Sequence, residues 1–342
     1  MFQAFRRFAL AFTVAALAML FVSTAAFAQY KAKTLVQNTG KKADTQLINP
    51  WGLAYGPSNY FWLSDEGSGV STLYNGTGKK QSLVVTIPPA SGSGLGTPTG
   101  IVYNASTQFQ INGWTSAFMF ATLDGLICGW SDFDPDNALI AVNNNSSGAV
   151  YTGLAITSHS SNNMIYAADF ANNKVDVYNG DFDLVTSFTD NNLPAGFAPF
   201  GIQDIGGQVY VAFAAQNGGS GGYIDIFDEN GTFVETLISG SPLNQPWGFA
   251  VAPSNFGPLS GTLLISNNTN TGTINGFDLT TGAFVGTIEA KAGKGSKAIT
   301  INQLWGIEFG GGSADNGKTN QLFYTAGPDN NADGIFGVIS YE

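Results

Sequence analysis

The chain has 342 residues, a formal net charge of −11, 44 Gly, one Cys and one His. Only 11% of its residues are charged, less than half of the roughly 25% found in an average soluble domain. The acidic balance excludes nucleic acid and anionic membranes as expected partners, because both are bound through clustered Lys and Arg. A single Cys cannot form an internal disulfide, and a single His leaves little basis for His-dependent catalysis or a zinc site.

Residues 1–28 have the pattern of a cleavable export signal. Arg6 and Arg7 form a positive start, an apolar stretch runs from Phe8 to Val22, and the small-residue pattern AFA precedes Gln29. A membrane anchor is the alternative, but Thr and Ser interrupt the roughly 20 apolar residues that a spanning helix needs. We therefore expect a secreted protein, periplasmic or extracellular, whose mature chain 29–342 has 11 Lys, no Arg and a net charge of −13.

A short phrase recurs six times along the chain, consisting of a large residue or Thr, then Gly, then apolar residues. Each of the first five phrases is followed by three more apolar segments that Gly, Asn and Asp turns separate, and the phrases are 47 to 58 residues apart. Four strands per repeat at this interval are typical of a β-propeller blade. The anchor glycines are Gly52, Gly100, Gly153, Gly201, Gly248 and Gly306.

The sixth repeat is one strand short at the C-terminus, and residues 32–37 offer the missing strand. We predict an all-β, six-bladed propeller of four-stranded blades, formed by residues 29–342 as one domain. The N-terminal strand would join the last blade and close the ring, because an open ring leaves an unpaired edge. Two stacked β-sandwiches are the alternative, but they do not explain six matched anchors.

With its PWG anchors and the segments LSDEGSGVSTLY and QLWGIEFGGG, the chain resembles a family of exported bacterial six-bladed propellers of uncharacterised function, similar to NHL-repeat propellers. The resemblance spans the mature chain and implies the fold and export. It transfers no catalytic residue. Relatives of this broad fold include metal-dependent lactonases, lyases and interaction scaffolds, so the fold alone does not choose a function.

Residues 329–334 match the D-x-N-x-D-G opening of a calcium loop, with Asp329, Asn331 and Asp333 as the expected ligands. The match is incomplete because Ser340 stands where such a loop has its bidentate Glu. An ordinary turn is the alternative, since Asn, Asp and Gly favour turns. A second alternating run at Asp132, Asp134 and Asp136 is interpreted as a solvated hairpin, with metal binding as its alternative.

Polar residues follow the second predicted strand of each repeat and should lie on one face of the ring. There they would surround one mouth of the central channel and hold a metal ion, a sugar or a peptide. Ordinary polar loops are the alternative. The candidates are Asp65, Glu66, Asp124, Asp169, Asn172, Asn267, Asn268 and Asp329.

Three other kinds of residue have simpler expected roles. His159 is expected in a rim loop, and Cys128 as a small buried residue of a strand. The anchor tryptophans Trp51, Trp247 and Trp305 are expected to pack in the core between adjacent blades rather than to stack on sugars.

The expected function is binding, without catalysis, of an unknown protein, peptide or carbohydrate through the loop face at the channel mouth. Neither nucleic acid nor, after signal removal, a membrane is expected as a partner. The alternative is a hydrolase or lyase in which a divalent cation, held by Asp and Asn at the same mouth, activates water or a carbonyl. Ca²⁺ is the only cofactor considered, and a scaffold that uses the blade edges is a third hypothesis.

Overall fold

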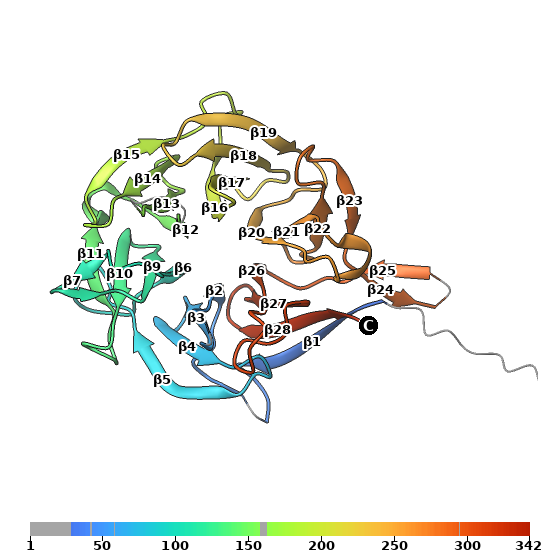
Figure 1. Ribbon diagram of the computed structural model, residues 1–342, viewed down its shortest axis with the longest axis horizontal. Coiled ribbons are helices and arrows are strands. Elements are labelled where there is room, and N and C mark those ends of the chain that lie inside the picture. Colours follow the sequence, from blue (N-terminus) through green and yellow to red (C-terminus); the bar gives the residue numbers. More distant parts are fainter. Residues whose placement is uncertain (1–28, 42, 58, 158–162, 294) are drawn as a thin grey trace, which may run out of the picture.

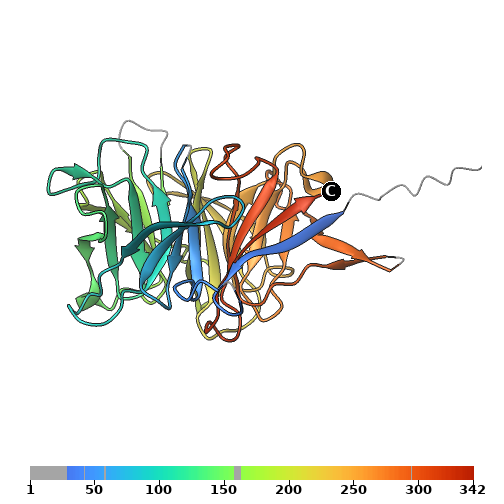
Figure 2. The ribbon, with the colours of Figure 1, turned by 90° about the horizontal axis from the view of Figure 1, so that it is seen from below.

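The computed structural model describes residues 29–41, 43–57, 59–157, 163–293 and 295–342. They form six four-stranded antiparallel sheets arranged around a central axis (Figure 1). Viewed from the side, the ring is a thick disc with strands running between its two faces (Figure 2). The predicted six-bladed, all-β propeller is confirmed.

Within each blade the strands run in order from the axis to the rim. The inner strand comes first in sequence, and the sixth blade takes its outer strand from the N-terminus. From inner to outer strand, the first blade consists of β2 (Pro50–Ala54), β3 (Phe61–Asp65), β4 (Val70–Tyr74) and β5 (Lys80–Thr86), and the second of β6 (Pro98–Tyr103), β9 (Phe118–Thr122), β10 (Leu126–Trp130) and β11 (Leu139–Asn143). The third blade consists of β12 (Tyr151–Ile156), β13 (Ile165–Asp169), β14 (Lys174–Tyr178) and β15 (Leu184–Phe188), and the fourth of β16 (Phe197–Ile205), β17 (Gln208–Ala215), β18 (Tyr223–Asp228) and β19 (Phe233–Ser239). The fifth blade consists of β20 (Pro246–Val251), β21 (Leu263–Asn267), β22 (Ile274–Phe277) and β23 (Phe284–Thr287), and the sixth of β26 (Leu304–Phe309), β27 (Gln321–Ala326), β28 (Ile335–Tyr341) and β1 (Tyr30–Gln37).

Four short strands lie outside this pattern. The hairpin of β24 (Glu289–Ala292) and β25 (Gly295–Ala298) projects from the rim between the fifth and sixth blades (Figure 1). A second short hairpin, of β7 (Gln110–Ile111) and β8 (Trp114–Thr115), lies in the segment that joins β6 to β9 in the second blade. The described residues also include the 3-10 turns η1 (Asn145–Ser147) and η2 (Gly257–Leu259). No helix among the described residues is long and apolar enough to cross a bilayer.

The anchor glycines allow neighbouring inner strands to approach each other closely. A Cβ on Gly201 would lie 1.9 Å from the carbonyl oxygen of Trp247, and one on Gly100 would lie 2.3 Å from the backbone nitrogen of Leu154. No side chain fits at such distances, so glycine is required wherever two backbones meet in this way. This contact explains why glycine recurs at every anchor.

The N-terminal strand closes the ring as predicted. β1 pairs antiparallel with β28, from Tyr30 opposite Tyr341 to Gln37 opposite Ile335. The backbone amide of Gln29 extends this ladder by donating to the carbonyl of Glu342 at 2.6 Å. The strand begins at Tyr30, two residues earlier than the sequence pattern indicated.

Candidate functional site at the mouths of the channel

The inner strands define two mouths of the central channel. We call the end where they begin the first mouth, and the end where they finish the second mouth. The second strands end beside the first mouth, because each is antiparallel to its inner strand. The candidate site predicted from the sequence therefore corresponds to the first mouth.

An aromatic cluster fills the axis at the first mouth. Trp51 and Trp305 stack with ring centroids 3.6 Å apart and an interplanar angle of 16°. Trp247 meets both edge-on, and Phe200 lies 6.2 Å from Trp51, which belongs to the opposite blade. All four side chains are buried, with Ala214 completing the cluster. The expectation that the tryptophans are core is confirmed, but their rings meet at the axis rather than only between adjacent blades.

Polar partners hold this aromatic cluster in place. The indole Nε1 of Trp305 donates to Asn49 Oδ1 at 2.9 Å, and that of Trp247 donates to the carbonyl of Thr152 at 3.0 Å. Asn49 also donates through Nδ2 to Glu66 Oε2 at 2.7 Å. Glu66, a predicted mouth residue, therefore supports the asparagine that orients Trp305.

Three predicted mouth residues share one structural position, the last residue of a second strand. Asp65, Asp169 and Asn267 are all buried there. Asp65 Oδ2 accepts from the backbone nitrogen and hydroxyl of Thr72, and Asn267 Oδ1 accepts from the backbone nitrogen of Asn244. These buried side chains therefore hold neighbouring backbone segments in place through hydrogen bonds.

The carboxyl group of Asp65 has a strongly raised pKa. Burial raises its pKa well above the usual range, and the hydrogen bonds from Thr72 only partly oppose this effect. Its second oxygen, Oδ1, is buried and has no hydrogen-bond partner. Because Asp65 has no exposed surface, its raised pKa does not mark a group that a ligand at the mouth would touch.

The other candidates are dispersed around the first mouth. Asp124 Oδ2 accepts from the backbone nitrogen of Ala90 at 2.6 Å, Asn172 donates to Asp169 Oδ2 at 2.8 Å, and Asn268 donates to the carbonyl of Leu304 at 3.1 Å. Each bond fixes a loop to its own blade or to the next one.

The predicted calcium loop is a tight surface turn. Asp329, Asn330 and Asn331 all have positive φ, at 55°, 53° and 68°, and their side chains are exposed, whereas Asp333 is half-buried. The backbone nitrogen of Asn331 donates to the carbonyl of Gly327 at 3.0 Å. Among the described residues, no three or more His, Cys, Asp or Glu side chains are grouped so as to hold a metal ion.

The remaining single residues lie away from both mouths or outside the described chain. Asp132, Asp134 and Asp136 occupy the turn between β10 and β11, where Asp134 accepts from Asn137 Nδ2 at 3.0 Å. Cys128 is a buried free thiol in β10, and burial raises its pKa. His159 and the proposed signal 1–28 lie outside the described residues.

The second mouth has a chemical character that the sequence analysis missed. At the second position after the anchor glycine, four blades carry a small apolar residue, whereas the fourth and sixth blades carry Gln203 and Glu308. Both line the central channel and an adjoining cavity of about 190 Å³ between the fourth, fifth and sixth blades. Aligning the six anchors would have revealed this pair. The apolar residues are Ala54, Val102, Ala155 and Ala250.

Glu308 is partly exposed, and its carboxyl group has a shifted pKa. Desolvation by the surrounding protein raises its pKa to about 7, and a backbone hydrogen bond from Phe309 only partly opposes this shift. Burial of Tyr55, in the neighbouring blade, raises the pKa of that tyrosine, and the nearby charge of Glu308 raises it further. A partly exposed carboxyl group that titrates near neutrality in a cavity can bind a cation or exchange a proton.

Comparison with solved structures places the fold among known propellers. The chain is similar to a gluconolactonase from Xanthomonas campestris, with a TM-score of 0.59, 14% identity and coverage of 92% of this chain and 90% of that one. A streptogramin B lyase gives a TM-score of 0.54 with 13% identity and coverage of 92% and 98%. At these identities the likeness shows the fold alone.

Comparison with curated sequences gives nearer relatives, all from Acanthamoeba polyphaga mimivirus. The uncharacterised protein L690 is 29% identical over 339 residues, which cover 92% of this chain and 86% of that protein. The uncharacterised protein R648 is 30% identical over 336 residues, which cover 91% of this chain and 80% of R648. These relatives are viral, so the bacterial part of the expected resemblance is not confirmed. No family model matches the chain. The chain belongs to the family of the mimivirus protein R648.

Proposed function

We propose that this protein is a non-catalytic binding propeller that holds an amine-bearing ligand, such as a lysine side chain of a peptide or a small polyamine, at the second mouth. The observation that carries the proposal is the pair Glu308 and Gln203, which line one cavity at a position where the other blades have apolar residues. An ionised Glu308 would attract the ammonium group, and Gln203 would supply an amide hydrogen bond.

The cavity and the charge of the chain both suit such a ligand. A volume of about 190 Å³ accepts a side chain or a short aliphatic amine, and Phe249 and Ala250 in the same wall would contact its methylene groups. The net charge of −11 favours the approach of cations over anions. An exported location, as the N-terminal sequence predicts, would expose this mouth to extracellular ligands.

Isothermal titration with cadaverine tests the proposal. The wild-type protein should bind this diamine more tightly at pH 8 than at pH 6, because Glu308 ionises across that interval. Glu308→Gln should weaken binding at least about tenfold, which corresponds to about 1.4 kcal/mol. Glu289→Gln, on the exposed β24, is the matched control and should bind normally. Equal affinity for both variants, or no binding by the wild type, would refute the amine site.

A metal-dependent hydrolase or lyase is the second candidate. A carboxyl group with a pKa near 7 suits a general acid or base, and this observation favours chemistry at the second mouth rather than at the first. Ca²⁺ bound by Asp329, Asn331 and Asp333 is a separate proposal for the exposed loop. Turnover of a lactone or ester that is lost in Glu308→Gln would favour the enzyme over the binding protein.

A further inference from the structure

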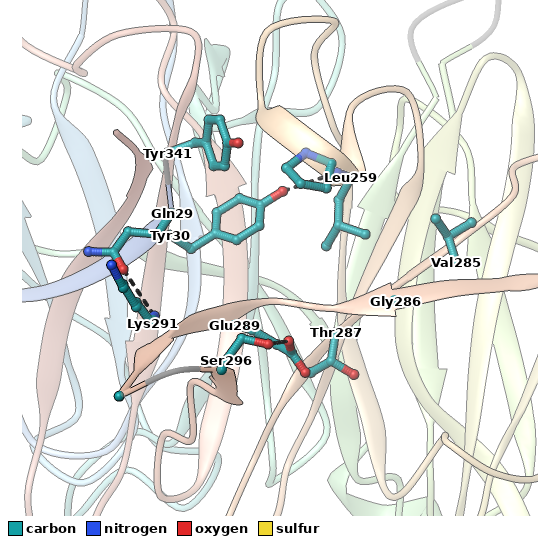
Figure 3. Close-up of a pocket in the computed structure, with 13 residues that line it drawn as sticks. Gln29, Tyr30, Leu259, Val285, Gly286, Thr287, Glu289, Lys291, Ser296 and Tyr341 are labelled. Atoms are coloured by element: carbon teal, nitrogen blue, oxygen red, sulfur yellow. Dashed lines mark hydrogen bonds between the residues drawn. The ribbon is translucent and has the colours of Figure 1, made fainter. Parts of the chain in front are cut away.

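Another cavity lies at the rim of the ring, and it shares no lining residue with the central channel. It is open to solvent, has a volume of about 670 Å³ and is lined by the outer strand of the fifth blade, the β24–β25 hairpin and the edge of the sixth blade. Figure 3 shows Tyr30, Tyr341 and Leu259 on one side, with β23 crossing below and the hairpin residues Glu289 and Ser296 beside it. None of these residues belongs to the candidate site at the second mouth.

A glycine on the outer strand of the fifth blade, Gly286, leaves this space open. Gly276 on β22 is opposite Gly286 on β23, whereas the equivalent pairs are Val177 with Thr186 in the third blade and Ile226 with Glu235 in the fourth. A Cβ on Gly286 would meet only Leu259 Cδ2, at 3.4 Å. The outer strand therefore lacks a side chain at the point where the cavity opens.

Aromatic rings form the opposite wall. The rings of Tyr30 and Tyr341 have centroids 5.1 Å apart and are tilted by 59°. The hydroxyl of Tyr30 donates to the carbonyl of Phe256 at 2.7 Å and accepts from the backbone nitrogen of Leu259 at 3.1 Å. Its polar atom is therefore already used in the protein and the residue is only 4% exposed, so the partly exposed ring of Tyr341 is the main aromatic surface for a ligand.

The hairpin adds a polar rim to this apolar wall. It accounts for the longest interval between anchor glycines, the 58 residues from Gly248 to Gly306, because β24 and β25 are additional to the four strands of the blade. Gln29 Oε1 accepts from the backbone nitrogen of Lys291 at 3.0 Å, and Glu289 accepts from Ser296. Charged groups thus stand on the hairpin, while Tyr30 and Leu259 cover the interior.

We infer that this cavity is a binding site for a small, uncharged aromatic molecule of two or three rings. Its volume falls within the roughly 300–1,000 Å³ of typical ligand pockets. Aromatic ligands gain edge and stacking contacts with tyrosine rings beyond simple area burial. The missing side chain at Gly286 gives such a ligand a flat backbone surface to lie against. This site is independent of the function proposed for the second mouth.

Fluorescence titration of the full chain with N-phenyl-1-naphthylamine tests the inference. The emission of this probe should increase on binding to the wild type. Gly286→Phe should weaken binding at least tenfold, because the new ring would occupy the cavity. Thr186→Phe places the same ring at the equivalent position of the third blade, where the side chain is exposed, and should bind like the wild type.

A second variant, at the neighbouring Val285, tests the inference independently in case Gly286→Phe does not fold. Val285 is 50% exposed and lines the cavity, and Val185 is 52% exposed at the equivalent place in the third blade. Val285→Trp should weaken probe binding, and Val185→Trp should not. Absence of binding by the wild type, or equal affinities within each matched pair, would overturn the inference. Binding of an alternating Thr-Val heptapeptide without binding of the probe would also overturn it, in favour of strand addition to β23.

Discussion

Gly306 in the last blade lies directly against the main chain of Trp51 in the first. A Cβ on Gly306 would come within 2.8 Å of the Trp51 carbonyl oxygen, and the hydroxyl of Thr325 donates to the same oxygen at 2.5 Å. The same hydroxyl accepts from the backbone nitrogen of Gly306 at 3.0 Å. One hydroxyl thus joins the two blades at which the ring closes, and the contact depends on the absence of a side chain at Gly306.

Gly306→Ala should lower the free energy of unfolding by about 1–3 kcal/mol, the usual cost of overpacking a tight contact. Urea unfolding followed by circular dichroism measures this change. The control is Gly295→Ala, since a Cβ there meets nothing within 4 Å. A Gly306→Ala variant as stable as the control would show that the inner strands do not meet as closely as described.

The aromatic cluster should be a main source of stability at the axis. Trp305→Ala removes a ring that stacks on Trp51 and contacts Trp247, and should cost about 3–5 kcal/mol, as is typical for truncating a large buried aromatic side chain. Its near-ultraviolet circular dichroism should lose the signal of coupled indoles. Trp114→Ala, at a half-exposed tryptophan on the rim, should change stability by much less, and a comparable loss there would contradict the assignment.

Stability should fall as the pH rises from 4 to 7. Asp225 is buried beside Asp190, and burial raises its pKa to about 7, an effect that the Thr236 hydroxyl only partly opposes. The unfolded chain releases this proton near pH 3.9. The folded state therefore binds more protons across the window, and the free energy of unfolding decreases with pH.

Asp225→Asn should flatten this dependence by up to about 1.4 kcal/mol per pH unit. Urea midpoints at pH 4, 5, 6 and 7 provide the measurement. Asp278→Asn is the control, because hydrogen bonds from Thr281 and Thr280 lower the pKa of the exposed Asp278, so its contribution lies below this window. Parallel pH profiles for Asp225→Asn and the wild type would contradict the burial argument.

Calcium should stabilise the protein if residues 329–334 form the predicted loop. At a calcium concentration of 100 times Kd the expected gain is about 2.7 kcal/mol, seen as a higher melting temperature that a chelator reverses. Asp329→Ala should abolish the gain, and Asp132→Ala, in the other acidic run, should retain it. An equal calcium response in both variants would contradict calcium binding at residues 329–334.

The sequence predicted the architecture well because the propeller repeats one local physical requirement. Each anchor needs glycine for a close backbone contact, and each blade needs four alternating strands, so six copies of the pattern reveal the ring and its missing strand. The direction in which each polar side chain points was less predictable. Asp65 and Asp169 follow strands in the expected order, but whether such a carboxylate faces the axis or turns under a loop depends on partners such as Thr72.

The second mouth was missed for a related reason. Glu308 stands inside a strand of apolar residues, and its importance emerges only when the six inner strands are aligned and their shared axis is known. The rim cavity likewise depends on the missing side chain at Gly286 and on the extra β24–β25 hairpin, neither of which was predicted from the sequence.

Titration of Glu308 by carboxyl ¹³C NMR tests the central claim most directly. The account predicts a pKa near 7 in the free protein, and a decrease of about one pH unit or more with saturating cadaverine, because a nearby ammonium group favours the ionised carboxylate. Glu308→Gln identifies the resonance. An ordinary pKa that cadaverine leaves unchanged would contradict an amine-binding site at the second mouth.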